Sequence, residues 1–203
     1  MTDVVIIDSG GANLASLVYA LRRLGTEAVV SSDAARIRAA SHVLLPGVGS
    51  AGNAMSRLNA AALNDVIPQL TQPVLGICLG MQLLFDSSAE ADAGVASTRC
   101  LGVLPGSVER LHPAPQRPVP HMGWNRLVTR QPDPLFADIA ATEYFYFVHS
   151  YAAPAVAGSL TLTEYGTHFS SAVRQRNFVG VQFHPERSAR PGARLLANFL
   201  RLT

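Results

Sequence analysis

The chain has 203 residues, of which 48% are hydrophobic, and its formal net charge is +2. This length suits a single domain, residues 1–203, and the composition excludes an intrinsically disordered chain. All 16 basic residues are arginine and are dispersed, so no basic stripe predicts nucleic-acid binding. No apolar run reaches the roughly 18 residues of a membrane helix, and no basic segment opens a signal peptide. With two cysteines and no disulfide pattern, we expect a cytoplasmic protein with reduced thiols.

The first half of the sequence alternates short β-rich runs with helical patterns. The predicted strands span residues 4–7, 27–30, 42–45 and 74–77. The first predicted helix has Asn13 as its candidate N-cap and Gly25 as its stop, and Ser32 or Asp33 is expected to cap a second, short helix. Strand–helix alternation of this kind predicts a parallel sheet with helices on both faces.

The second half has a different character. Proline and glycine are frequent over residues 102–120, which predicts loops and short strands. The β-rich runs span residues 144–151, 160–164, 171–174 and 178–183, and a helical pattern covers 193–200. The predicted fold is therefore α/β, with a mostly parallel central sheet and an antiparallel extension. Active sites of such sheets lie beyond the carboxyl ends of the strands.

The stretch Gly76-Ile77-Cys78-Leu79-Gly80 joins a predicted strand to a helical pattern. This is the arrangement of a nucleophile elbow, with sulfur in place of the serine oxygen. Flanking glycines remove the Cβ atoms that would obstruct a sharp turn, and the N–H groups of a helix start favour a thiolate. A buried structural cysteine is the alternative, but the two glycines and the strand-to-helix switch favour a nucleophile. Cys100 has no such setting and is expected to be structural.

A cysteine nucleophile needs a base, and the base needs a group that orients it. His184 follows the predicted strand 178–183, and Pro185 ends that strand. Glu186 is then placed to accept a hydrogen bond from the second imidazole nitrogen, as the third member of a triad. The other histidines stay open as alternatives, because periodicity does not choose among them: His42, His112, His121, His149 and His168.

The segment Pro46-Gly47-Val48-Gly49 also follows a predicted strand, so it is expected to face the same crevice as Cys78. Its backbone N–H groups, with that of Leu79, are candidates for an oxyanion hole; a plain tight turn is the alternative. The spacing does not match a dinucleotide-binding fingerprint, and no His, Cys, Asp or Glu spacing resembles a zinc site. We therefore expect neither a cofactor nor a metal.

Two motifs together carry a family resemblance. Gly76-Ile77-Cys78-Leu79-Gly80-Met81-Gln82 and Gln182-Phe183-His184-Pro185-Glu186 resemble the class I, triad-type glutamine amidotransferases, and the resemblance covers essentially the whole chain. Within that family, three further segments resemble the glutaminase subunits of imidazole glycerol phosphate synthases, which serve histidine biosynthesis. They are Pro46–Gly49, Pro120-His121-Met122-Gly123-Trp124-Asn125 and Tyr146-Phe147-Val148-His149-Ser150-Tyr151. The resemblance implies a three-layer fold, and a glutaminase that passes ammonia by a closed route to a cyclase partner, expected to be a (β/α)₈ barrel, in a heterodimer.

The resemblance also implies a role for each motif residue. Cys78 would be the nucleophile, His184 the general base and acid, and Glu186 the orienting group. The implied oxyanion hole comprises Gly47, Val48, Gly49 and Leu79. The implied glutamine-binding residues are Gln82, Ser150 and Tyr151. The residues implied to face the partner are Asn13, Trp124, Asn125 and Arg187. Many family members carry lysine at the position of Arg187; arginine keeps the charge but gives a planar, bidentate donor.

Three other functions remain open at this point. A different class I amidotransferase, serving pyridoxal phosphate or anthranilate synthesis, would share the triad, although the His-Met-Gly-Trp-Asn segment argues against it. A stand-alone cysteine hydrolase would turn over without any partner. A catalytically silent binding subunit would normally have lost a triad residue, and all three candidates are present here.

Overall fold

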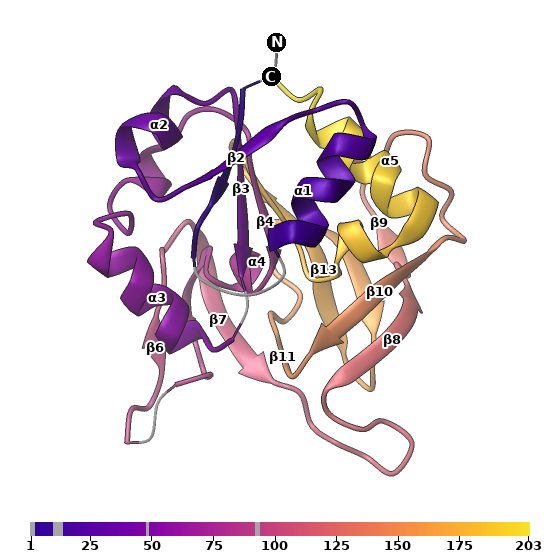
Figure 1. Cartoon of the computed structure of the whole chain (residues 1–203). Coiled ribbons are helices and arrows are strands. Elements are labelled where there is room, and N and C mark those ends of the chain that lie inside the picture. Colours follow the sequence, from indigo (N-terminus) through magenta and orange to yellow (C-terminus); the bar gives the residue numbers. More distant parts are fainter. Residues whose placement is uncertain (1–2, 10–13, 48, 92–93) are drawn as a thin grey trace.

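The computed structural model describes residues 3–9, 14–47, 49–91 and 94–203 (Figure 1). Its central sheet has eight strands in the order β2-β1-β3-β4-β14-β13-β12-β9. Their bounds are β1 Val4–Ile7, β2 Ala28–Ser31, β3 His42–Gly47, β4 Val74–Cys78, β9 Thr129–Arg130, β12 Ser159–Glu164, β13 His168–Gln175 and β14 Phe178–Val181. From β2 to β14 neighbouring strands are parallel, and from β14 to β9 they are antiparallel.

Two smaller sheets accompany the central one. The first pairs β8 (His121–Arg126) with β10 (Tyr144–His149) in antiparallel register. The second has the order β11-β7-β5-β6. Its strands are β5 Phe85–Ser88, β6 Thr98–Arg99, β7 Leu104–Arg110 and β11 Tyr151–Ala152.

Helices cover both faces of the central sheet, as Figure 1 shows, with α1 and α5 on one side and α2 and α3 on the other. The α-helices are α1 Leu14–Arg23, α2 Ala34–Ala39, α3 Ala51–Ala60, α4 Leu79–Gln82 and α5 Ala189–Phe199, and the short 3₁₀ turns are η1 Ile67–Gln69, η2 Pro134–Phe136 and η3 Pro185–Arg187. Alternation along β1 divides the core. Val4 and Ile6 pack in the cluster that includes α1 and α5, and Val5 and Ile7 pack in the cluster that includes α2 and α3. The predicted three-layer α/β fold is confirmed.

The predicted elements agree with the structure at most of their centres and differ at some ends. Asp33 caps α2, because its Oδ1 accepts a hydrogen bond from Arg36 N at 2.7 Å. The third strand continues through Pro46 to Gly47, and α5 begins at Ala189, so that Pro191 lies in its first turn, where no N–H is needed. Asn13, the candidate cap of α1, lies outside the described residues.

Several elements were not anticipated, among them α3 and the strands β5, β6, β8 and β9. The helix α3 is rich in alanine and polar residues, so its apolar periodicity is weak. The seven-residue strand β7 lies where proline and glycine predicted loops and short strands. Among the described residues, no helix has both the length and the apolar character needed to cross a bilayer.

Candidate active site

Cys78 joins β4 to α4 with an unusual backbone conformation, φ 53° and ψ −110°. A residue with a Cβ adopts a positive φ only at an energetic cost. Such a conformation persists only where the surrounding structure enforces it. The strained strand-to-helix turn is the geometry of a nucleophile elbow. Since α4 is a single turn, its dipole favours a thiolate less than a long helix would.

Close backbone packing explains the glycines around the elbow. A Cβ atom on Gly80 would lie 1.7 Å from the carbonyl oxygen of Leu45. On Gly76 it would lie 2.8 Å from the oxygen of Gly80, and on Gly47 it would lie 2.8 Å from the nitrogen of Gly80. These distances exclude any side chain, so β3, β4 and α4 approach one another only because glycine occupies all three positions.

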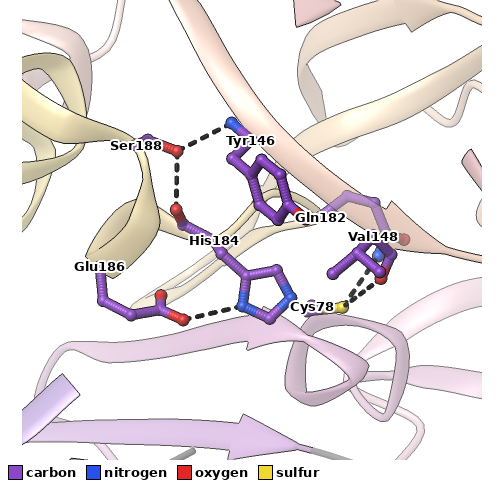
Figure 2. Close-up of polar contacts among 7 residues, drawn as sticks. All are labelled: Cys78, Tyr146, Val148, Gln182, His184, Glu186 and Ser188. Atoms are coloured by element: carbon purple, nitrogen blue, oxygen red, sulfur yellow. Dashed lines mark hydrogen bonds and ion pairs between the residues drawn. The ribbon is translucent and has the colours of Figure 1, made fainter. Parts of the chain in front are cut away.

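His184 reaches the same end of the sheet through strand pairing. The strand β14 lies parallel to β4, with Val181 opposite Ile77, and His184 follows it at the start of η3. His184 N donates a hydrogen bond to the carbonyl oxygen of Tyr146 at 2.9 Å. Ser188 Oγ donates to the carbonyl oxygen of His184 at 2.6 Å and accepts from Tyr146 N at 2.9 Å (Figure 2). The backbone that carries the imidazole is therefore anchored to β10.

The imidazole of His184 lies between Glu186 and Cys78, as Figure 2 shows. Its Nδ1 is 2.8 Å from Oε1 of Glu186, and both side chains are nearly buried. Burial lowers the pKa of His184, but its hydrogen bonds to Cys78 and Glu186 and the charges of these groups raise it to about 10 overall. The protonated imidazole is thus the favoured form at neutral pH, which is the form that stabilises a neighbouring thiolate.

A pocket of about 460 Å³ opens over Cys78 and His184. The described residues that line it are Gly47, Gly49, Cys78, Leu79, Gln82, Glu90, Pro120, Val148, His149, Ser150, Tyr151, His184 and Arg187. The structure thus brings the candidate glutamine-binding residues and most candidate oxyanion-hole residues to one cavity. Val48 lies outside the described residues.

Gln82 connects the pocket to a buried residue for which the sequence predicted no role. Its Nε2 donates to the carbonyl oxygen of Tyr151 at 2.7 Å and to Oε1 of Gln182 at 2.9 Å. Nε2 of Gln182 in turn lies 3.6 Å from Sγ of Cys78.

The comparison with known proteins gives the family. The family model described as glutamine amidotransferase class-I matches residues 5–202. The chain belongs to this family. The imidazole glycerol phosphate synthase subunit HisH of Xylella fastidiosa is 50% identical over 202 residues, which cover 100% of this chain and 98% of that protein. The subunit of the same name from Shewanella oneidensis is 49% identical over 212 residues, which cover 98% of this chain and 96% of that protein.

Solved structures of low sequence identity share the fold. A putative GMP synthase subunit from Thermoplasma acidophilum superimposes with a TM-score of 0.73 at 17% identity, over 98% of this chain and 92% of that one. A structure described as glutamine amidotransferase superimposes with a TM-score of 0.72 at 21% identity, over 97% and 96% of the two chains. The class I amidotransferase fold is therefore confirmed.

Glu90 is a pocket residue of this amidotransferase that the sequence did not reveal. Its Oε2 accepts a hydrogen bond from Ala51 N, the first residue of α3, at 2.8 Å. Burial raises its pKa, and the hydrogen bond from Ala51 opposes that shift. Glu90 lies in no recognisable motif and reaches the pocket only through the tertiary fold. Among the described residues, no group of three or more metal-ligating side chains is suited to hold a metal ion.

The candidate interface residues that the structure describes lie on and near the β8–β10 sheet. The indole of Trp124 makes an edge contact with the ring of Tyr146, and the Arg187 guanidinium lies 4.8 Å from the centre of the same ring. Asn125 turns its Nδ2 to the carbonyl oxygen of Glu164, at 3.0 Å, and to Nε2 of His121, at 3.3 Å. Tyr146 therefore joins Trp124 to Arg187, whereas the side chain of Asn125 is held by contacts inside this chain. Asn13 lies outside the described residues.

Two of the alternative histidines form a buried pair. Nδ1 of His121 lies 3.0 Å from Nε2 of His149, and Nδ1 of His149 lies 2.8 Å from the carbonyl oxygen of Tyr151. Burial lowers the pKa of His121 to about 4. Burial also lowers the pKa of His149 to about 3, together with the repulsion from a second proton on His121 and from the charge of His184. Both imidazoles are neutral at physiological pH.

Proposed function

We propose that this chain is the glutaminase subunit of an imidazole glycerol phosphate synthase. It hydrolyses glutamine to glutamate and ammonia and delivers the ammonia to a cyclase subunit in histidine biosynthesis. The observation that carries the proposal is the convergence of Cys78 and His184 at one pocket, with Glu186 bonded to the imidazole of His184, in a member of this family. The names of its relatives, at about 50% identity over the whole chain, support the choice within the family.

The proposed reaction begins with attack of the Cys78 thiolate on the side-chain carbonyl of glutamine. The negative oxygen is held by backbone N–H groups from Leu79 and the segment Gly47–Gly49. His184 gives its proton to the leaving ammonia and then takes a proton from the water that hydrolyses the γ-glutamyl thioester, so the thiolate and the imidazolium are regenerated. Glu186 keeps the imidazole in the orientation that both steps need.

The same pocket supplies groups for the amino-acid part of glutamine. The Glu90 carboxylate is proposed to accept hydrogen bonds from the α-ammonium group of glutamine. The backbone near Ser150 and Tyr151 is proposed to bind the α-carboxylate. Gln82 is proposed to contact the same part of the substrate from the elbow side. Support comes from their shared position along the wall of the cavity that contains Cys78.

Ammonia must reach the partner unprotonated if it is to act as a nucleophile, so a closed route between the subunits is part of the proposal. The partner is a cyclase, expected to be a (β/α)₈ barrel, that forms imidazole glycerol phosphate and aminoimidazole carboxamide ribotide. The proposed interface includes Trp124, Asn125 and Arg187, and Asn13. Exposed apolar side chains on β8 and β10 support it, since such patches mark contact surfaces: Met122 (68%), Trp124 (52%) and Tyr144 (44%).

Co-expression with the cyclase tests this function. We expect a one-to-one complex that makes both products from glutamine. A chain that binds no cyclase and hydrolyses glutamine at full rate alone is a stand-alone hydrolase. A chain that instead supplies ammonia to a different synthase is another class I amidotransferase.

A further inference from the structure

Gln182 is a fully buried side chain beside the nucleophile that the proposed reaction leaves without a role. It directly follows β14, in the stretch that also carries His184, and it has no solvent-accessible surface. Its Nε2 lies 3.6 Å from Sγ of Cys78, a hydrogen-bonding distance for the large sulfur atom. Its Oε1 contacts Gln82, another residue of the pocket wall. Because the amide nitrogen contacts the nucleophile and the amide oxygen contacts a pocket residue, we expect this side chain to contribute to catalysis.

Backbone chemistry fixes the direction of this amide. The carbonyl oxygen of Tyr151 can only accept hydrogen bonds, so the atom of Gln82 that lies 2.7 Å from it must be Nε2. The same nitrogen lies 2.9 Å from the side chain of Gln182, whose facing atom must therefore be Oε1. The NH₂ group of Gln182 then necessarily faces the sulfur. The carbonyl oxygen of Tyr151, at the far end of this chain of hydrogen bonds, therefore determines that Gln182 presents N–H groups to Cys78.

We propose that Gln182 is a further catalytic residue, which donates an amide N–H to the Cys78 thiolate and holds Gln82 in place through its oxygen. The inference deepens the proposed glutaminase function and rests on it for its significance. With His184 on the other side, the sulfur receives donors from two directions. Since a neutral amide does not titrate, this donor stays available at every pH and also stabilises the sulfur when it leaves the thioester.

The contacts of the sulfur differ between its two protonation states. As a thiol, Cys78 donates to the carbonyl oxygen of Val148 at 3.8 Å. As a thiolate it has no proton to give, and it accepts from Gln182 and from the protonated His184. Loss of the Gln182 donor therefore weakens the thiolate form selectively, which reduces the fraction of reactive thiolate at a given pH.

Other titratable or charged groups near the sulfur also influence the Cys78 thiol, so their influence must be distinguished from the effect of losing the Gln182 amide. His184 faces Cys78 from the end of β14, with Glu186 behind it, and His149 faces the pocket from β10. Glu90 and Arg187 lie on the pocket wall. None of these groups is altered when Gln182 is replaced, so a shift of the thiol titration reports the missing amide.

The test is the pH dependence of alkylation of Cys78 by iodoacetamide, in a Cys100→Ala background so that one thiol reacts. We expect Gln182→Met to raise the apparent pKa of the thiol by about one unit, so that alkylation below that pKa is about tenfold slower. Gln182→Glu, which places a carboxylate beside the sulfur, should raise it further. An unchanged profile in a folded Gln182→Met protein would overturn the proposal.

A matched control separates this role from general loss of structure. Ser171 accepts a backbone hydrogen bond from Gln182 N at 2.9 Å, and its hydroxyl pairs with Thr161 rather than with the thiol, at 2.8 Å. Ser171→Ala should leave the alkylation profile unchanged, and a shift equal to that of Gln182→Met would contradict the proposal. Alkylation needs neither glutamine nor a partner. Failure of this test with intact glutaminase activity therefore rejects the role of Gln182 and leaves the proposed function standing.

A measurement on the unaltered side chain keeps the proposal testable if the Gln182 variants do not fold. In protein labelled with ¹⁵N-glutamine, one side-chain amide should shift over the pH range in which Cys78 titrates. The shift should vanish in Cys78→Ala. Absence of any glutamine amide that follows the thiol titration would overturn the proposal.

Discussion

Nδ1 of His184 lies 2.8 Å from Oε1 of Glu186, and the two residues belong to one tight turn after β14. Only Pro185 separates them, so the orientation of the imidazole is set within a few residues of chain. The sulfur, in contrast, comes from a different strand and reaches the imidazole only because β14 pairs with β4. The pairing of histidine with glutamate is therefore local, and the pairing of histidine with cysteine depends on the sheet.

His184→Ala should lower kcat for glutamine hydrolysis in the complex by about 10²–10⁴-fold, because the proton donor and acceptor is lost. Glu186→Gln should cost less, since the imidazole remains, although effects within a triad are not additive. Glutamate release at saturating glutamine measures both. His121→Ala and His149→Ala should keep thioester chemistry, and a loss in either that equals that of His184→Ala would mean that another histidine is the base.

The buried histidine pair predicts acid sensitivity of folding. In the unfolded chain histidine titrates near 6.5, whereas burial lowers the pKa of His121 to about 4 and that of His149 to about 3. Between these values the unfolded chain binds more protons, so the free energy of unfolding falls as pH decreases from about 6.5 toward 4. The contribution of His184 to the free energy of unfolding depends on pH in the opposite direction. Because its pKa is raised to about 10 in the folded chain, its protonation stabilises the fold fully below about pH 6.5, and this stabilisation is lost as the pH rises toward 10.

Urea unfolding at pH 5 and pH 7 measures this dependence. His121→Asn should reduce the difference in unfolding free energy between the two pH values, by up to about 1.4 kcal/mol per pH unit for one proton. His168→Asn, at an exposed side chain, should leave the difference unchanged. Equal slopes in all three proteins would contradict the assignment of neutral, buried imidazoles.

Gly80→Ala should destabilise the fold by at least about 3 kcal/mol, because its Cβ would lie 1.7 Å from a carbonyl oxygen of β3. Gly25→Ala is the control for backbone strain alone, since Gly25 has φ +75° and a Cβ there would meet no other atom within 4 Å. This control should cost about 1–2 kcal/mol. Urea unfolding compares the two. Similar losses would show that close approach at the elbow is not what requires glycine.

Glutamine hydrolysis should be slow in the isolated chain and about 10²–10³-fold faster with the cyclase and its nucleotide ligand, which is the scale of one oxyanion-hole donor. The segment Gly47–Gly49 favours such a switch, because a glycine permits a peptide flip at low steric cost and Gly49 adopts φ +85°. A few kcal/mol of preference for the formed hole would suffice. Equal turnover by the chain alone, with cyclase, and with cyclase and ligand would exclude the switch.

Local motifs made much of this site predictable. The elbow at Cys78 and the pair His184 and Glu186 are each contained in a short segment, so residue type and spacing made them candidates, and the family resemblance selected His184 from the six histidines. The strands of the parallel core were predictable for the same reason, because their apolar runs are continuous.

The remaining features depend on contacts between distant segments. Glu90 reaches the pocket by bonding the start of α3, 39 positions away, and Gln182 meets Gln82 across 100 positions. Contacts between residues so far apart along the chain produce no periodicity or motif by which the sequence could predict them. The helix α3 shows that a segment of weak apolar periodicity can still be folded by tertiary packing.

The most direct test of the central claim is a comparison of Cys78→Ala with wild type in the complex with the cyclase. We predict that the variant makes no product from glutamine but keeps full synthesis when ammonia is supplied, because only ammonia generation requires the thiol. Cys100→Ala should behave like wild type in both assays. A Cys78→Ala complex that still hydrolyses glutamine at near the wild-type rate would contradict the account.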